Sequence, residues 1–171
     1  MDIHVTADGA PRIGEVQLRC APGGAGIIAA KSEGDGATPV GCFPLRRVLY
    51  RGDRMSQPVT SLETQTIRPD DGWCDDPGDP AYNRPVTLPY PASAESLWRE
   101  DGVYDVIVIL GHNDDPPVSG NGSAIFMHVA RAGYAPTEGC VALALADLRN
   151  VLRQCRPGDR ICISAPDACR K

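Results

Sequence analysis

The sequence lacks a hydrophobic run of about 18 residues or more, which is the length that a membrane-spanning helix needs. We therefore expect no integral membrane segment. Residues 1–5, MDIHV, also lack the basic region followed by an apolar stretch that marks a secretory signal peptide. Three alternatives stay open: a protein that remains in the cytoplasm, export by another route, or a leader that has already been removed.

An excess of positive charge is missing as well. The 17 Lys and Arg residues stand against 22 Asp and Glu residues, and the resulting net charge of −5 makes nucleic acid an unexpected partner. The chain has no C-x-x-C pair, which weakens the interpretations as a zinc ribbon or a thioredoxin-like redox protein. It also has no internal repeat and no low-complexity tract.

Glycine and proline, in contrast, are abundant. The chain has 18 Gly and 16 Pro in 171 residues, whereas an average chain has about 12% of the two together. This excess predicts many turns and argues against a helical bundle. A hydrophobic fraction of 42% excludes wholesale disorder. We expect a single domain over residues 1–171 that buries one sizeable core.

Cysteine is present in an odd number, so at least one thiol stays unpaired if the others pair within the chain. Two interpretations are open. The thiols are small buried side chains in a reducing compartment, or some of them form disulfides whose partners one sequence cannot choose. The seven residues are Cys20, Cys42, Cys74, Cys140, Cys155, Cys162 and Cys169.

The hydrophobic pattern predicts a mainly β domain with one clear late helix. Residues 104–110 form an apolar, β-branched run that is typical of a central strand. Residues 144–154 place their leucines and Val151 on one helical face, and residues 93–99 predict a short helix with Ser93 as its N-cap. Further strands are expected at residues 15–20, 25–30, 43–50, 62–68, 123–130 and 160–164.

Residues 69–91 are too rich in proline for a regular element. A long loop inside a compact domain is usually functional or disordered. The segment carries Trp73, Tyr82 and Tyr90, and these aromatic residues favour an ordered loop that covers a site and excludes water from it. A surface loop with incidental aromatic residues is the alternative.

One pair of residues indicates chemistry: His128 in a predicted strand and Cys140 after a turn and Gly139. A cysteine needs a nearby base to become a thiolate at neutral pH. Gly139 lets the backbone bend so that successive N–H groups converge, as an oxyanion hole requires. A helix starting just after Cys140 would add the positive end of its dipole. The alternative is a structural histidine and an inert core thiol.

These residues resemble the catalytic motif of the L,D-transpeptidases of the YkuD type, which cross-link peptidoglycan. The motif here is His128 followed by Thr137-Glu138-Gly139-Cys140, and the resemblance covers about residues 25–164. It implies a mainly β (α+β) YkuD-type β-sandwich with a helix following the catalytic cysteine and a long covering loop. Residues 31–39, 41–45, 72–76, 82–84, 111–114 and 120–126 also look like a divergent branch of the family.

The resemblance implies a role for each motif residue. Cys140 is the nucleophile, His128 is its general base, and the backbone carbonyl of Val129 orients the histidine. The backbone N–H groups of Gly139 and Cys140, with Glu138 as a further candidate, hold the oxyanion. A donor stem peptide acylates the sulfur, and the side-chain amine of diaminopimelate on a second stem accepts the acyl group. No metal or organic cofactor is needed.

The sequence departs from the family pattern at two positions. The family usually has a second histidine where Glu138 stands, and an Arg or Asn where Ala142 stands. A subgroup of this appearance joins L-Ala at stem position one to diaminopimelate at position three. Cross-links of the 3-3 type and of this 1-3 type therefore both stay open. The family places the protein in the periplasm or cell envelope, although no export signal is visible.

Several residues are candidates for binding the stem peptides. Arginines bind free carboxylates well, and the aromatic residues belong to the covering loop. Asp75 and Asp76 are turn formers in the first place, with N-caps and contacts to the acceptor amine as the alternatives. The expected substrate-binding residues are Trp73, Tyr82, Arg84, Arg99, His112, Thr137 and Glu138.

Three other functions remain as alternatives. A cysteine amidase or endopeptidase would use the same scaffold with water as the acceptor, and a wall-binding module would use it without catalysis. A metal site of His112, His128 and Cys140 has unusual ligand spacing. Because a histidine-paired cysteine has a lowered pKa, we also expect Cys140 to be the thiol most sensitive to alkylation. The oligomeric state is left open.

Overall fold

The computed structural model describes residues 1–6, 12–13 and 16–165. Its elements are mostly short strands, with one α-helix among the described residues. Their bounds are β1 Asp2–Val5, β2 Arg12–Ile13, β3 Val16–Gln17, β4 Cys20–Ala21, β5 Ile27–Ile28, β6 Thr38–Pro39, β7 Gly41–Tyr50, β8 Thr64–Thr66, β9 Asp71–Cys74, β10 Pro85–Thr87, β11 Ala94–Ser96, β12 Val106–Leu110, β13 Phe126–Val129, the 3₁₀ turn η1 Ala132–Tyr134, β14 Val141–Leu143, α1 Leu145–Gln154 and β15 Arg160–Ile163.

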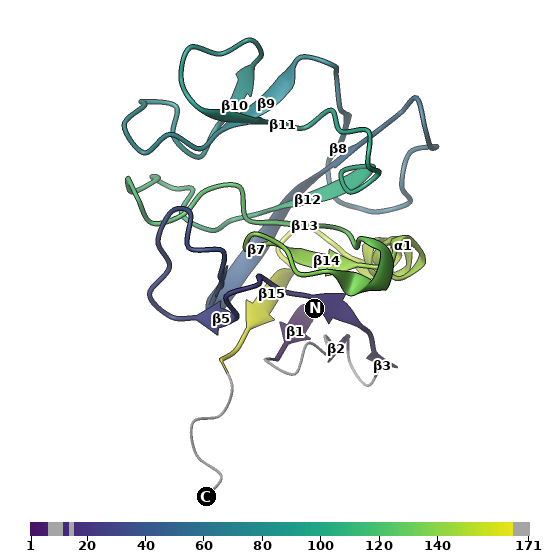
Figure 1. Cartoon of the computed structure of the whole chain (residues 1–171). Helices are drawn as coiled ribbons and strands as arrows, with labels where there is room; N and C mark the ends of the chain where they lie inside the picture. Colours follow the sequence, from purple (N-terminus) through teal and green to yellow (C-terminus); the bar gives the residue numbers. More distant parts are fainter. Residues whose placement is uncertain (7–11, 14–15, 166–171) are drawn as a thin grey trace, which may run out of the picture.

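A curled sheet of ten strands runs through the molecule, in the order β3-β2-β1-β15-β7-β12-β13-β14-β4, with β8 also paired to β7. The long strand β7 joins its two parts, because it pairs with β15 at its start and with β12 along the rest of its length. A separate three-stranded sheet, β10-β9-β11, lies above β12 and β13 in Figure 1. The mainly β fold with one helix is therefore confirmed.

Strand β12 is buried on both faces, which explains its continuous apolar run. Side chains alternate between the two faces of a strand. Val106, Val108 and Leu110 point into the larger core, whereas Ile107 and Ile109 point into a smaller core under the three-stranded sheet. The sheet thus separates two apolar layers, and the functional groups described below lie on the side of the smaller one.

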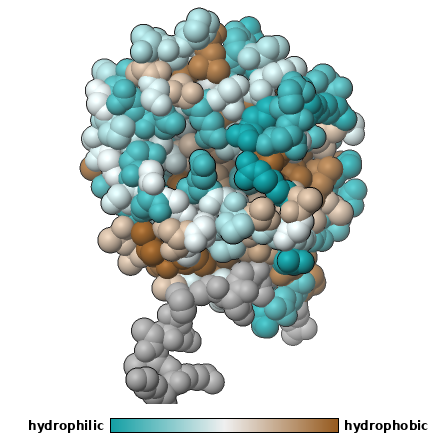
Figure 2. Space-filling model, viewed as in Figure 1, coloured by the Kyte–Doolittle hydropathy of each residue, from teal (hydrophilic) through white to brown (hydrophobic). Residues whose placement is uncertain are grey.

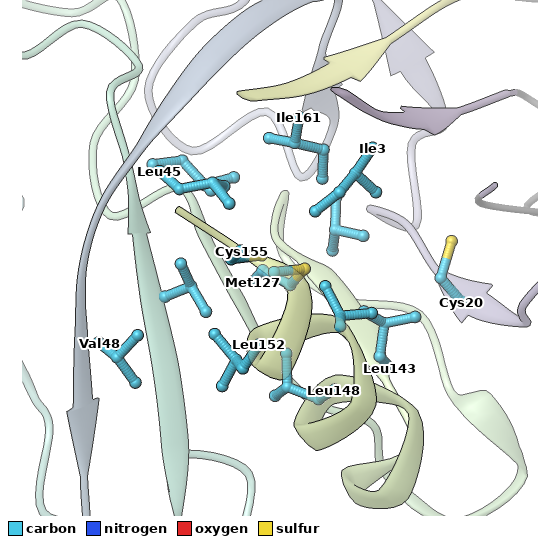
Figure 3. Packing of buried hydrophobic residues seen from close by; sticks show 14 of the residues in the cluster. Ile3, Cys20, Leu45, Val48, Met127, Leu143, Leu148, Leu152, Cys155 and Ile161 are labelled. Atoms are coloured by element: carbon cyan, nitrogen blue, oxygen red, sulfur yellow. The ribbon is translucent and has the colours of Figure 1, made fainter. Parts of the chain in front are cut away.

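Helix α1 closes the larger core. Leu148, Val151 and Leu152 are fully buried in it, and Figure 3 shows Leu148 and Leu152 in one cluster with side chains from β7, β1 and β15. The hydrophobic pattern predicts Leu145 on the buried face as well. The structure exposes 37% of that residue, because it begins the helix at the edge of the core.

Most predicted elements are confirmed with shifted ends. Residues 43–50 lie within β7, which begins two residues earlier. Residues 104–110, 123–130 and 160–164 contain β12, β13 and β15, and residues 144–154 contain α1. Residues 25–30 and 62–68 contain the shorter strands β5 and β8, and residues 16–20 fall into β3 and the start of β4. Glu15, where the first of these strands was expected to begin, and Cys169 lie outside the described residues.

Two expectations about the middle of the chain are wrong. Residues 93–99 do not form a helix with Ser93 as its cap, because residues 94–96 pair with β9 as strand β11. Residues 69–91 are not free of regular elements either, since they contain β9 and β10. Pairing with strands distant in sequence overrides the local preferences in both segments.

The face of the molecule shown in Figure 2 is mostly hydrophilic, with hydrophobic residues in small separate areas. Among the described residues, no helix is long and apolar enough to cross a membrane.

A disulfide joins Cys42 on β7 to Cys162 on β15, opposite each other in the antiparallel pair. It closes a loop of 120 residues in sequence, and a cross-link of this span stabilises the folded state by restricting the unfolded chain. Three other cysteines, Cys74, Cys140 and Cys155, are free thiols, and these three and Cys20 are buried. The chain therefore has both a disulfide and buried thiols, the two states that the sequence left open.

We expect the double variant Cys42→Ser/Cys162→Ser to lose about 2–5 kcal/mol of unfolding free energy. Urea unfolding of the two proteins measures the difference. Dithiothreitol should lower the midpoint of the native protein and leave that of the double variant unchanged. A native midpoint that does not respond to reduction would contradict a stabilising disulfide.

Candidate active site

The pairing of β13 with β14 brings His128 and Cys140 to one face of the sheet. The two strands are parallel, with Met127 opposite Val141 and His128 opposite Ala142. Met127 and Val141 point into the larger core, so the residues next to them point to the other face. Cys140 directly precedes β14, and its Sγ accepts a hydrogen bond from the backbone N–H of Phe126 at 3.3 Å.

A tight turn before β14 fixes the position of Cys140. Gly139 has a φ of 134°, and a Cβ at this residue would lie 2.8 Å from the carbonyl oxygen of Ala37. The hydroxyl of Thr137 accepts the Gly139 N–H at 3.1 Å and donates to the Cys140 carbonyl at 2.7 Å. Thr137 is itself held by backbone hydrogen bonds to Pro22 and Gly24. The motif therefore needs glycine and threonine at these positions for structural reasons.

Cys140 and His128 both line a cavity of about 560 Å³, here called the Cys140 cavity. Its walls come from the loop at residues 31–36, the ends of the small sheet, β13 and the turn before β14. Three of the predicted substrate-binding residues, Arg99, Thr137 and Glu138, belong to these walls. The full lining is Lys31, Glu33, Gly34, Asp35, Gly36, Asp75, Glu95, Arg99, Val103, Tyr104, Ser123, Ala124, His128, Arg131, Thr137, Glu138 and Cys140.

The other four predicted substrate-binding residues are not among those that line this cavity. Trp73 is buried in the smaller core, edge-on to Phe126. The Tyr82 hydroxyl donates to Glu33 and accepts the Gly122 N–H, so it holds two loops together. Arg84 lines a second, smaller cavity of about 250 Å³, and His112 Nε2 lies 3.0 Å from the Asn121 carbonyl oxygen.

Asn83 organises the site, a role that the sequence analysis did not predict although residues 82–84 resemble the family. Its Oδ1 accepts the indole N–H of Trp73 at 2.9 Å and the backbone N–H of Ala124 at 3.0 Å. Its Nδ2 donates to the carbonyl oxygens of His112 and Asn113. Ala124 has a φ of 51°, an unusual value for a residue with a side chain. Asn83 thus fixes the strained residue whose carbonyl faces Cys140.

His128 is held as a neutral base. Its Nδ1 lies 2.9 Å from the Val129 carbonyl oxygen, and since a carbonyl only accepts, Nδ1 carries the proton and Nε2 keeps its lone pair. The ring is 4% exposed and packs edge-on against Tyr104. Burial lowers the pKa of His128 to about 4, because a charged imidazole loses its hydration there. At neutral pH the ring can therefore accept a proton.

Cys140 is a neutral thiol in this structure. Its Sγ donates to the Ala124 carbonyl oxygen at 3.2 Å, and the residue is 7% exposed. Burial raises the pKa of Cys140 to about 12, so the expected lowering of this pKa is wrong. One reason is that strand β14 follows the cysteine and α1 begins only at Leu145, whereas a helix dipole acts on groups at the first turn.

Tyr104 and Glu95 lie beside His128 in the wall of the Cys140 cavity. The Tyr104 hydroxyl donates to Glu95 at 2.6 Å, and burial raises the pKa of Glu95. The Arg99 guanidinium lies over the Tyr104 ring and pairs with Asp101. Arg99 is therefore already neutralised by a neighbour.

The described residues include no group of three or more His, Cys, Asp or Glu side chains placed to hold a metal ion. His112 also stands apart from the lining of the Cys140 cavity. The alternative of a metal site made by His112, His128 and Cys140 therefore finds no support in the geometry.

The family model of the YkuD L,D-transpeptidase catalytic domain matches residues 7–163, nearly the whole chain. The chain belongs to this family. Searches of curated proteins and of solved structures gave no match. YkuD domains typically are L,D-transpeptidases that act on peptidoglycan peptides, and the family is generally associated with the cell envelope. The resemblance inferred from the sequence is thereby confirmed.

We expect Gly139→Ala to unfold at lower urea concentration than the wild type. The left-handed φ costs about 1–3 kcal/mol for a residue with a side chain, and the clash with the Ala37 carbonyl adds to this cost. Gly133→Ala is the matched control, because Gly133 has a φ of 71° but no atom within 4 Å of the added Cβ. Equal losses in the two variants would contradict the close approach at Gly139.

Alkylation of Cys140 should be slow at pH 7 and should accelerate up to at least pH 10 without a plateau. A thiol with a pKa of about 12 is almost entirely protonated at neutral pH, and only the thiolate reacts. Iodoacetamide labelling followed by peptide mapping measures the rate for Cys140 alone. A plateau below pH 8 would show a preformed thiolate instead.

Proposed function

We propose that this YkuD domain is a peptidoglycan L,D-transpeptidase that forms stem-peptide cross-links through a thioester on Cys140. One observation carries the proposal: a thiol and a neutral imidazole lie on the same face of the sheet and line the same cavity. The family supplies the class of reaction. The geometry supports Cys140 and His128 as the side chains that carry out this reaction.

In the first step, Nε2 of His128 accepts the proton of the Cys140 thiol as the sulfur attacks the carbonyl carbon of the donor stem. The thiol leaves its hydrogen bond to Ala124 as it does so. The Gly139 N–H is held by Thr137, so we assign the developing oxyanion to the N–H groups of Cys140 and Glu138. The carbon–nitrogen bond then breaks, and the leaving amine takes the proton from His128.

In the second step, an amine of the acceptor stem replaces the sulfur. The side-chain ammonium of diaminopimelate first loses one proton to solvent, and the free amine attacks the thioester carbon. A carbon–nitrogen bond forms and the carbon–sulfur bond breaks. The second proton passes from nitrogen through His128 to the sulfur, which restores the neutral thiol. If water attacks instead, the same steps give a carboxylate and hydrolysis.

The cross-link is proposed to be of the 3-3 type or of the 1-3 type that joins L-Ala to diaminopimelate. Glu138 is exposed at the cavity wall where the family usually has a second histidine, so a carboxylate faces the bound peptides there. We propose that the protein works in the cell envelope. The Cys42–Cys162 disulfide supports this location, because disulfides persist in oxidising compartments.

Purified muropeptides incubated with the protein and analysed by mass spectrometry test the proposal. We expect cross-linked dimers and a mass increase on Cys140 that corresponds to the acyl group. Cys140→Ala should abolish both, because it removes the nucleophile, and Cys155→Ala is the matched control because Cys155 is a buried thiol of the larger core.

Each other outcome has a distinct meaning. Shortened monomers without dimers would replace transfer by hydrolysis, as in an amidase or endopeptidase. Product formation that survives Cys140→Ala would refute both catalytic functions. The absence of any product, together with binding to the wall polymer, would indicate a non-catalytic module.

A further inference from the structure

Among the described residues, two buried side-chain atoms have no hydrogen-bond partner, and both residues line the Cys140 cavity. They are Oδ1 of Asp75 and Oγ of Ser123, and Ser123 is only 7% exposed. Burying a polar atom without a partner costs free energy. That both atoms belong to the wall of the same cavity indicates that a ligand supplies the missing partners.

Backbone hydrogen bonds hold both residues in place. Asp75 follows β9, and its N–H donates to the Ser93 carbonyl oxygen at 3.2 Å, just before β11. Ser123 lies between two residues with positive φ, Gly122 and Ala124, whose N–H groups bind the Tyr82 hydroxyl and Asn83 Oδ1. The Ser123 hydroxyl interacts with the Tyr82 hydroxyl, which gives its own proton to Glu33, so the lone pairs of Ser123 Oγ stay available to a donor from a ligand.

The charges of the cavity favour a cation at this place. Its three basic side chains already have acidic partners: Lys31 pairs with Asp35, and Arg99 and Arg131 both pair with Asp101. Asp75 forms no ion pair within residues 1–6, 12–13 and 16–165. A carboxylate and a hydroxyl oxygen without partners are hydrogen-bond acceptors, and an ammonium group is a donor with three N–H bonds.

We propose that Asp75 and Ser123 form a subsite that binds the primary ammonium group of the acceptor stem peptide. The inference rests on the transpeptidase function proposed above and names the residues that select an amine over water. The ammonium donates one hydrogen bond to Asp75 and one to Ser123. After it loses one proton to solvent, the amine keeps a hydrogen bond to Asp75 while it attacks the thioester.

Calorimetric binding of two probes to the full chain tests the subsite. One is a stem peptide with a free side-chain amine on its third residue, and the other is the same peptide with that amine acetylated. The native protein should bind the free amine at least about tenfold more tightly, as expected for a hydrogen-bonded charge. Asp75→Asn should remove this preference, and Ser123→Ala should reduce it.

Asp76→Asn is the matched control, because it removes the same charge one residue away. Asp76 is not among the residues lining the cavity, and its Oδ1 accepts the Gly78 N–H in a turn. This variant should keep the preference for the amine. Equal affinity for the two probes in the native protein, or a preference that survives Asp75→Asn, would overturn the subsite.

The outcome separates the subsite from the proposed function, because the thioester on Cys140 is scored independently with the donor peptide alone. If the thioester forms and the amine preference is absent, the subsite fails and the transpeptidase function stands. If no thioester forms and the preference depends on Asp75, the function fails and the amine site stands.

Discussion

The parallel pairing of β13 with β14 decides which side of the sheet each functional group faces. With Met127 opposite Val141, both apolar side chains enter the larger core and Cys140 lies on the face that carries His128. A slip of one residue in β14 would turn the thiol into that core. The burial of Met127 and Val141 on both strands therefore holds the register on which the chemistry depends.

The same burial sets the resting state of the site. It lowers the pKa of His128 and raises that of Cys140, so both groups are neutral and the thiol is bonded to the backbone. In the reaction proposed above, proton transfer between them therefore accompanies substrate attack instead of preceding it. Asn83 supports this arrangement from the loop side, since it fixes the conformation of Ala124. The small sheet forms part of the wall of the Cys140 cavity and supports the site. Trp73 and Tyr82 do not line this cavity.

The sequence predicted the elements whose residue pattern is long and continuous along the chain. The apolar run of β12 and the amphipathic α1 lie where the sequence pattern predicts them, and the motif of His128 and Cys140 predicted the family. The strand β11 was missed because its pairing with β9 is not local. The expected lowering of the Cys140 pKa was wrong because burial of the thiol raises its pKa, and the depth at which a side chain is buried depends on the whole fold. The role of Asn83 depends on loops distant in sequence that meet only in the fold.

The position of β15 has a consequence for how the chain is made. This strand, the last among the described residues, lies between β1 and β7. In the sheet order, β1, β2 and β3 join the remaining strands through β15. Strands β1, β2 and β3 leave the ribosome before β15, so they find their place in the sheet only after residues 160–163 have been synthesised. Until then, β7 presents an open edge to the cell, which is a surface prone to wrong pairing.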